Sequence, residues 1–340
     1  MKTEAMLFID ENYNYAKKTY KRIKNKSNYS IAFILGNYEL NGLFCNDSKI
    51  DKTNKLLKLG YDLVIEIPYI IYLTSFELFS DYLTKLCNEF NVEKIYLPSE
   101  NSSLKQFKNN HSSYKFYYPS YDKIFHQYLN DYNYLDASKL SKDYITKFYQ
   151  MRVYDYLNLN LITSFKKNMI KYQFIKSNYT YNFNNNFDSY FKHIKLYFTY
   201  SDSTAIKNIE INTVNMLKNK LYKINNFDEF MQLSLPKNFQ FGTFFRSILL
   251  TLLNIDPCFK LDKYVIKYLG FNRNGSNLIR NYKKINKENH LEIISNINPS
   301  NSMIEKYQYD FDLLYSYLFY NKYNSNSDLY IFPIKFDKNY

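Results

Sequence analysis

The chain has 340 residues, a formal net charge of +13 and 46% hydrophobic residues. This length is sufficient for two domains of modest size, each with its own core, and we expect two. No segment approaches the roughly 20 uninterrupted apolar residues of a membrane-spanning helix, and the first residues lack the apolar core of a signal peptide. We therefore expect a soluble, cytoplasmic protein without a membrane partner.

The excess of positive charge fits a polyanionic partner, because lysines that neutralise phosphates release counterions from nucleic acids. Only five of the 45 basic residues are arginine, however, and the chain is rich in Asn, Tyr, Ile and Phe. A codon bias toward A and T produces the same composition. Composition alone therefore leaves nucleic-acid binding open.

The cysteines and histidines show no spacing that is typical of a metal or catalytic site. Cys45, Cys87 and Cys258 form neither a CxxC pair nor an even-numbered framework, so we interpret them as reduced core thiols. The four histidines lie far apart in the sequence, and no metal site is predicted. Spacing also supports no Ser-His-Asp or Cys-His arrangement, so the sequence assigns no catalytic residue.

The first hundred residues alternate between short apolar runs and segments with helical periodicity. Strands are predicted at Met6–Ile9, Ser30–Leu35, Tyr61–Ile67 and Val92–Leu97, and helices at Tyr15–Lys26, Ile50–Leu59 and Thr74–Asn91. Gly60 is expected to end the second helix as a C-cap. Such alternation predicts a parallel sheet with helices on both faces, which binds ligands outside the carboxyl ends of its strands.

The pattern changes after the first hundred residues. Asn101–Tyr121 has no clear period and is expected to form a long loop or insertion. A helix is expected at Ser138–Asn158, a strand at Leu161–Phe165, and a further helix beginning at Ala205. Beyond Ile224 the strand signals fade, and helices are predicted at Phe227–Leu233, Gly242–Leu253, Asp262–Tyr268, Gly275–Tyr282, His290–Ile297 and Tyr309–Tyr320. We therefore predict a Rossmann-like α/β domain at residues 1–222 and a mainly helical domain at residues 223–340.

Three phrases of the first hundred residues carry a family resemblance. They are IAFILGNY followed by NG at Ile31–Gly42, GYDLVIEIP at Gly60–Pro68, and YLPSE at Tyr96–Glu100. They resemble the bacterial tRNA(Met) cytidine acetate ligase family, whose phrases MSGNF, QRG, GxDLVIELP and FGSE occur at the same spacings. The chain follows that pattern without a gap from Glu11 to Glu100.

Two later phrases extend the resemblance into the second half. KNFQF at Lys237–Phe241 leads to Arg246, and YVIKYLGFN at Tyr264–Asn272 is followed by Gly275. Both are similar to phrases of the family's helical half. The resemblance thus covers most of the chain, and it implies a HIGH-type nucleotidyltransferase version of the Rossmann-like sheet followed by a tRNA-binding helical domain.

The resemblance also implies a reaction and its ligands. The family uses ATP with magnesium to activate acetate as acetyl-adenylate, and it transfers the acetyl group to N4 of the wobble cytidine of elongator tRNA(Met). Positions similar to the family's nucleotide-binding site are Gly36, Asn37, Ser99, Glu100, Lys167, Ser203, Thr204 and Lys207. The expected partners are therefore ATP, acetate and tRNA, whereas the oligomeric state is not implied.

Some of these positions have a simpler structural explanation. Asp202–Lys207 is similar to the family's S-x-T-x-I-R helix start, which offers hydroxyls, amides and a cation to phosphates, but a simple N-cap explains the same residues. Lys167 stands where the family has an arginine, and a lysine is a point charge that binds phosphate less specifically. Glu66 ends a strand where this fold opens onto its ligand, although carboxylates before proline also serve in loops and caps.

The family's HxGH signature is the main departure. Counted from Glu11, its positions are Ala16, Lys17, Lys18 and Thr19, so neither histidine is present. Loss of such transition-state donors costs on the order of 10²–10³ in rate each. The sequence therefore leaves open a weakly active or altered ligase and an inactive homologue that binds RNA or another partner. A nucleotidyltransferase with a different acyl or phosphate substrate is a third alternative.

Basic residues near the later phrases are candidates for a tRNA backbone surface. We predict that Lys237, Arg246 and Lys267 contact RNA phosphates. A solvated helix face would carry the same kind of residues. Further basic residues of this region are Lys263, Arg273, Arg280, Lys283 and Lys284.

Overall fold

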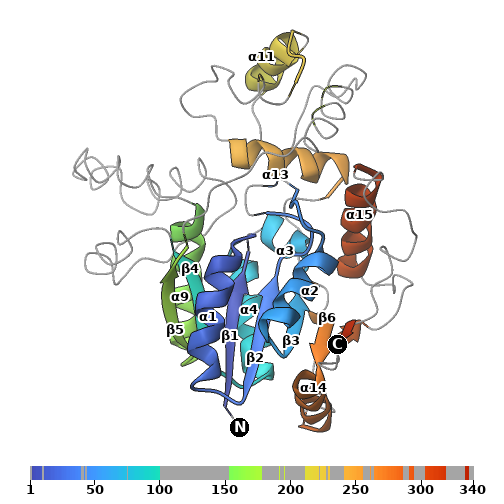
Figure 1. Ribbon diagram of the computed structural model, residues 1–340. Helices are drawn as coiled ribbons and strands as arrows, with labels where there is room; N and C mark the ends of the chain where they lie inside the picture. The colour runs from blue at the N-terminus through green and yellow to red at the C-terminus, as the bar shows by residue number, and fades with distance from the viewer. Residues whose placement is uncertain are drawn as a thin grey trace, which may run out of the picture.

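The computed structural model has an eight-stranded sheet at its centre (Figure 1). It describes residues 2–9, 11–39, 42, 44–74, 76–99, 153–177, 191, 195, 211–221, 223–226, 229, 241–255, 261, 264–285, 291–294, 303–318 and 334–336. The strands are β1 (Thr3–Phe8), β2 (Tyr29–Ile34), β3 (Leu63–Glu66), β4 (Val92–Ser99), β5 (Lys171–Lys176), β6 (Tyr264–Asn272), β7 (Leu291–Ile294) and β8 (Ile334–Phe336). The described helices are α1 (Tyr13–Lys24), α2 (Lys49–Leu59), α3 (Tyr69–Thr74), α4 (Phe76–Glu89), α9 (Val153–Lys167), α11 (Ile211–Leu221), α13 (Phe241–Leu252), α14 (Arg273–Ile285) and α15 (Met303–Leu318).

Strands β1 to β5 run parallel in the spatial order β5-β4-β1-β2-β3. The chain winds outward from β1 in one direction through β2 and β3, and in the other direction through β4 and β5. The direction therefore changes between β1 and β4. In open α/β sheets, ligands bind outside the carboxyl ends of the two strands at such a point.

Strands β1, β2 and β3 are buried on both faces and divide their apolar side chains between two cores. Met6 and Ala32 pack with side chains of α1 and α2, whereas Leu7 and Ile31 pack with side chains of α4 and α9. Successive side chains of a strand point to opposite faces, so a continuous apolar run feeds both cores. Figure 1 shows α1 and α2 on the near face of the sheet and α4 behind it.

Local sequence signals explain where the first helices begin and end. The side chain of Asn12 accepts a hydrogen bond from the Tyr15 amide and caps α1. Ser48 and Asp51 form a capping box at the start of α2. Gly60 ends α2 with a φ of 111°, which confirms the predicted C-cap, because few other residues adopt that conformation.

The C-terminal region requires a correction. The expected helices at 262–268 and 290–297 are wrong, because the described residues 264–268 and 291–294 lie in β6 and β7. Strand β6 pairs antiparallel with β3, and β7 and β8 both pair with β6. Val265 and Leu269 belong to opposite cores, so β6 is a strand buried on both faces. A short apolar run of this kind cannot be distinguished from a buried helix by periodicity. Residue 222 therefore does not separate the sheet from a helical half.

The predicted α/β fold with a mainly parallel sheet is confirmed, and so is the alternation of strands and helices in the first hundred residues, to which the structure adds α3. Helices α13, α14 and α15 also correspond to predicted helices. The strand expected at 161–165 is wrong, since these residues lie within α9. The expectations for 101–121, 138–152, 227–228 and 230–233, and the start of the helix expected at 205, fall outside the described residues. Within the described part of the chain, no helix is long and apolar enough to cross a bilayer.

Candidate functional site

The carboxyl ends of β1 and β4 meet the amino end of α1. The Nδ2 atom of Asn12 donates to Ser177 Oγ at 2.8 Å, and the Ser177 amide donates to the Ser99 carbonyl at 2.9 Å. These contacts hold the start of α1 against the ends of β4 and β5. A helix amino terminus carries partial positive charge, so this edge favours an anion, while the Tyr13 and Tyr15 amides already donate to the Glu11 carbonyl and to Asn12 Oδ1. Of the predicted nucleotide-binding residues, Ser99 lies here.

Glu11 links this edge to the loop before α2. Its Oε1 atom accepts a hydrogen bond from the Asp47 amide, and its Oε2 atom accepts one from Asn46 Nδ2 at 2.9 Å. The Tyr13 hydroxyl donates to the Asp47 carboxylate at 2.6 Å. Burial and this carboxylate raise the pKa of Tyr13, so the phenol stays protonated. Glu11 thus orders the loop beside the candidate site.

The positions of the HxGH signature do not reach this edge. Ala16 and Thr19 are fully buried on the inner face of α1, while Lys17 and Lys18 are exposed on its outer face. The Thr19 hydroxyl donates to the Tyr15 carbonyl at 2.9 Å, and the Tyr61 hydroxyl donates to the Ala16 carbonyl at 3.0 Å. The phosphate chemistry of two imidazoles therefore has no equivalent in α1. The feature of α1 that suits a phosphate is the positive end of its dipole.

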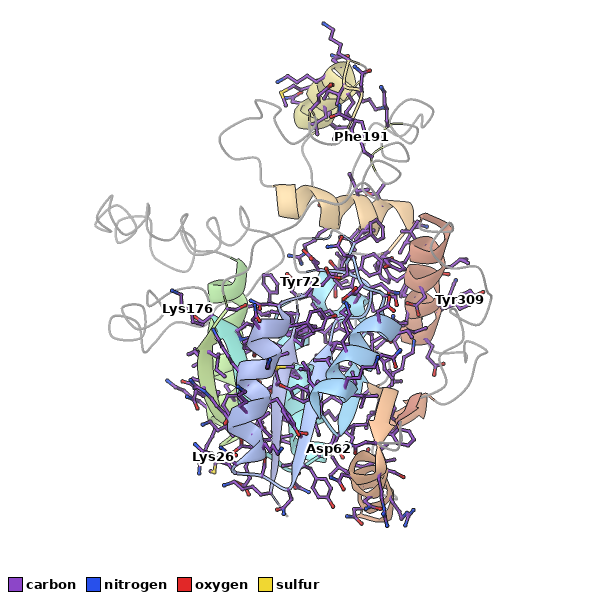
Figure 2. All side chains as sticks on the ribbon, viewed as in Figure 1. Lys26, Asp62, Tyr72, Lys176, Phe191 and Tyr309 are labelled. Carbon is purple, nitrogen blue, oxygen red and sulfur yellow. The ribbon has the colours of Figure 1, made fainter. Side chains whose placement is uncertain are left out.

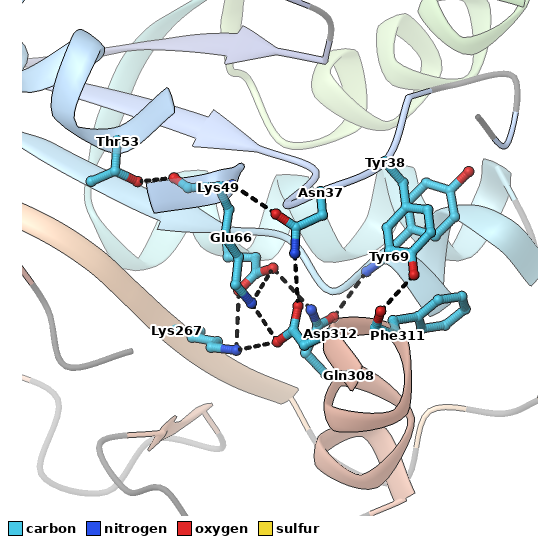
Figure 3. Close-up of polar contacts among 10 residues, drawn as sticks. All are labelled: Asn37, Tyr38, Lys49, Thr53, Glu66, Tyr69, Lys267, Gln308, Phe311 and Asp312. Carbon is cyan, nitrogen blue, oxygen red and sulfur yellow. Dashed lines mark hydrogen bonds and ion pairs between the residues drawn. The ribbon is translucent and has the colours of Figure 1, made fainter. Parts of the chain in front are cut away.

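A second polar cluster lies at the carboxyl ends of β2 and β3 (Figure 3). Lys267 Nζ is 3.1 Å from Glu66 Oε2 and 3.5 Å from Asp312 Oδ2. Lys49 Nζ is 3.3 Å from each Glu66 carboxylate oxygen and also pairs with Asp312. We call these four residues the ion cluster. Its two ammonium groups and two carboxylates cancel in formal charge, so it holds no surplus charge for a ligand.

Burial and ion pairing act in opposite directions on the pKa values in the ion cluster. Burial raises the pKa of Asp312, but the ammonium groups of Lys49 and Lys267 outweigh it and lower that pKa. Burial lowers the pKa of Lys267, but Glu66 and Asp312 outweigh it and raise that pKa. Both groups are therefore charged at neutral pH, as their pairing requires.

Amide side chains complete the ion cluster. Asn37 Oδ1 accepts from the Lys49 amide at 2.7 Å, and Asn37 Nδ2 donates to Asp312 Oδ1 at 3.2 Å. Gln308 Nε2 donates to Glu66 Oε1 at 2.9 Å, and Gln308 Oε1 accepts from the Tyr69 amide at 3.2 Å. These hydrogen bonds join α2, β3 and α15 and satisfy polar groups that burial would otherwise penalise.

Three predicted site residues therefore lie in the ion cluster or against it. Gly36 has a φ of +74°, and a Cβ there would lie 2.4 Å from Glu66 Oε1, so the close approach requires glycine. Asn37 is buried and bonded on both sides of its amide. Lys267, which we expected to contact RNA, has a side chain only 15% exposed and paired inside the fold. An RNA contact by Lys267 is thus excluded by its place in β6.

A third cluster joins two family-like phrases that lie far apart in the sequence. Asp62 Oδ2 accepts from the Ser30 hydroxyl at 2.8 Å, and Asp62 Oδ1 accepts from Asn272 Nδ2 at 2.9 Å. The Gly275 amide donates to Asn272 Oδ1 at 3.0 Å. Figure 2 shows Asp62 at the lower end of the sheet, opposite the candidate site. The Asp62 and Asn272 side chains therefore hold β3, β6 and α14 together.

Arg246, the second expected RNA contact, also serves the fold. Its Nη2 atom donates to the carbonyls of Leu73 at 2.9 Å and Tyr72 at 3.3 Å, in the last turn of α3. Its guanidinium carbon lies 5.0 Å from the centre of the Phe76 ring. The charge that we assigned to RNA thus caps the carboxyl end of α3, where a cation is favoured. Arg246 anchors α13 to the sheet domain.

Replacing Arg246 with glutamine is expected to lower the free energy of unfolding by about 1.5–3 kcal/mol, because two hydrogen bonds from a charged donor are lost. Urea unfolding measures the change. The exposed Arg280 of α14 provides the control, and Arg280→Gln should shift stability by less than about 0.5 kcal/mol. Affinity for tRNA should be the same in the wild type and Arg246→Gln, and a selective loss of tRNA binding would restore the RNA assignment.

The remaining predicted residues are not drawn into these clusters. Lys167 is exposed in the last turn of α9. Glu100, Ser203, Thr204, Lys207 and Lys237 lie outside the described residues. In the described ranges, no group of three or more His, Cys, Asp or Glu side chains is placed to hold a metal ion.

Sequence reasoning missed Lys49, Gln308 and Asp312. Lys49 carried no signal beyond its place after a helix N-cap. Gln308 and Asp312 did carry one, because they share a helical face with buried apolar residues of α15. Polar side chains on an apolar helix face require buried partners. The apolar residues of that face are Ile304, Phe311 and Tyr315.

Comparison with known proteins agrees with this fold. Residues 14–151, about two fifths of the chain, match the family model described as HIGH Nucleotidyl Transferase. No curated protein matched the chain. A crystal structure of Thermotoga maritima TmcAL bound with alpha-thio ATP is similar, with a TM-score of 0.68 and 15% identity, over 99% of this chain and 100% of that one. An apo form of the same protein gives a TM-score of 0.67 and 15% identity over 98% and 99%.

Proposed function

We propose that this chain binds ATP and acts as a tRNA(Met) cytidine acetate ligase. Its residues 14–151 match the model of the HIGH nucleotidyl transferase family. In that reaction the acetate carboxylate attacks the α-phosphorus of ATP, which releases pyrophosphate and forms acetyl-adenylate. The N4 amine of the wobble cytidine then attacks the acetyl carbonyl and releases AMP. The observation that carries the proposal is the correspondence with TmcAL over practically the whole length of both chains.

The residues at the end of β1 and β4 support the ATP-binding part of the proposal. The positive end of the α1 dipole and the end of β4 at Ser99 lie together at the carboxyl edge of the sheet, the edge at which open α/β sheets bind ligands. Asn12 and Ser177 hold these two elements at a fixed distance. This chain therefore offers the positive end of a helix dipole to a nucleotide, while imidazole donors are missing from α1.

A second function is favoured by the burial of Ala16 and Thr19. Without the two histidines, the rate of adenylate formation should fall by on the order of 10⁴–10⁶, from 10²–10³ for each donor. Such a protein would keep the fold and bind RNA without ligase chemistry. RNA binding needs only distributed cations, whereas adenylate formation needs several precisely placed groups.

The two functions are separated by ATP titration and by acetate-dependent exchange of labelled pyrophosphate into ATP. The ligase should bind ATP with magnesium and catalyse exchange, although slowly. Protein that binds tRNA but neither binds ATP nor exchanges pyrophosphate would support the RNA-binding function instead.

Ser99→Ala is expected to weaken ATP affinity about fivefold, the equivalent of one hydrogen bond. Isothermal titration calorimetry measures this change. The matched control is Ser27→Ala, at the opposite end of the sheet, where the hydroxyl bonds the Ile23 carbonyl. Equal ATP affinity in the wild type and both variants would place the nucleotide away from β4.

A further inference from the structure

The solvent face of α1 and its following turn carry six cations and no anion. Lys17, Lys18, Lys21, Arg22, Lys24 and Lys26 are all exposed, and we call these residues the α1 basic face. The sequence contains no Asp or Glu from residue 13 to residue 28. None of the six forms an ion pair with another described residue. Their charges are therefore not neutralised within the described fold.

Further cations adjoin the lower end of this face. Lys94 in β4 lies beside Lys171 in β5 in the strand register. Burial lowers the pKa of Lys94, the Glu4 carboxylate opposes this, and the neighbouring charges of Lys26, Arg22 and Lys2 lower the pKa further, so these cations are close enough to repel one another. Bound phosphates would relieve this repulsion, because they place negative charge between like charges.

The α1 basic face leads toward the candidate nucleotide site. Helix α1 has twelve residues and is therefore about 18 Å long at 1.5 Å per residue. The amino end of α1 meets the carboxyl ends of β1 and β4, and Figure 2 shows Lys26 near the opposite end of the sheet. Lys17, Lys21 and Lys24 are spaced to form one stripe along the helix. An extended polyanion lying on this stripe would end at the candidate site.

We propose that the α1 basic face binds the phosphate backbone of an RNA stem and directs the adjoining loop to the carboxyl edge of β1 and β4. This inference rests on the proposed function for its choice of RNA as the partner. The two expected RNA contacts that the structure describes, Arg246 and Lys267, are engaged within the fold, whereas the α1 cations are open to solvent.

The surface chemistry favours RNA over an anionic membrane. A helix that lies in a membrane interface must insert an apolar face. The apolar face of α1 is already buried, with Tyr15, Ala16 and Ile23 in the core. Within the described ranges, the exposed large apolar side chains are on other segments, at Met169, Ile211, Met303 and Leu313. The α1 basic face thus supplies charge without the apolar contact that membranes require.

The test compares two triple variants of equal net charge. Lys17→Gln, Lys21→Gln and Lys24→Gln together remove one stripe, whereas Lys166→Gln, Lys223→Gln and Lys306→Gln remove three exposed lysines elsewhere. Fluorescence anisotropy measures binding of a transcribed elongator tRNA(Met) from about 50 to 200 mM salt. The α1 triple should lose more than about tenfold in affinity, and its salt slope should fall by about 2–3 at roughly 0.7–0.9 per phosphate contact.

The control triple should change tRNA affinity by less than about twofold, since its lysines contact no phosphate. Equal losses in the two triples would overturn the proposal, because net charge alone would then explain the binding. Binding to phosphatidylserine vesicles without binding to tRNA would overturn it in favour of a membrane. Urea unfolding checks that both triples fold. Failure of the ligase proposal appears separately, in the pyrophosphate exchange assay, which contains no RNA.

Discussion

Asp312→Asn should lower the free energy of unfolding by about 3–5 kcal/mol, because Lys49 and Lys267 would then share one carboxylate in a buried site. Urea unfolding at neutral pH measures the loss. Glu93→Gln is the matched control, since it breaks a pair with Lys2 in which both side chains are about half exposed. That control should cost less than about 1 kcal/mol. Equal costs would show that the ion cluster is open to solvent.

The same variant should alter the dependence of stability on pH. The pKa of Asp312 is lower in the folded protein than its unfolded value of about 3.9. Its carboxylate therefore contributes stability above the unfolded pKa, and this contribution is lost as the pH falls through the folded pKa. Below about pH 4 the wild type should lose stability more steeply than Asp312→Asn. Parallel acid curves for the two proteins would contradict the pairing.

Gly275→Ala should cost about 3 kcal/mol or more, because the new methyl group meets backbone that cannot move freely. A Cβ at this position would lie 2.0 Å from the Asp62 carbonyl oxygen, which itself accepts the Asn272 amide at 3.0 Å. Overpacking usually costs about 1–3 kcal/mol, and here the obstacle is a hydrogen-bonded carbonyl rather than a flexible side chain.

Thermal and urea unfolding measure the effect of Gly275→Ala. Asn277→Ala on the exposed side of α14 tests the effect of alanine in the same helix, and it should change stability by no more than about 0.5 kcal/mol. A Gly275→Ala protein as stable as the Asn277→Ala protein would show that α14 lies farther from β3 than described here.

The sequence predicted the first hundred residues well because their strands and helices form from neighbouring segments. Each strand is buried on both faces and so reads as an apolar run, and Gly60 marks a helix end through its backbone conformation alone. The same reasoning gave the wrong result for strand β6, which was expected to be a helix. Its apolar run has the same composition as a buried helix, and its partner β3 lies about 200 residues earlier.

The sequence identified charged residues that could contact RNA, but it did not show which way their side chains point. Charge at Lys267 and Arg246 was evident from the sequence, but only the fold shows that both side chains turn inward. Conversely, the missing histidines were evident from Ala16 and Thr19, and the structure adds that both positions are buried. Which side of an element faces solvent depends on non-local packing, which short-range periodicity does not specify.

The pairing of β3 with β6 has a consequence for synthesis of the chain. During synthesis on the ribosome, the edge of β3 that pairs with β6 stays unpaired until residue 272 has emerged. The hydrogen bond from Gln308 to Glu66 forms later still, because Gln308 follows Glu66 by 242 residues. Long-range pairing of this kind folds slowly, and an exposed strand edge invites aggregation in the meantime. The first hundred residues, which are the most predictable from sequence, therefore complete their own packing only after α15 has left the ribosome.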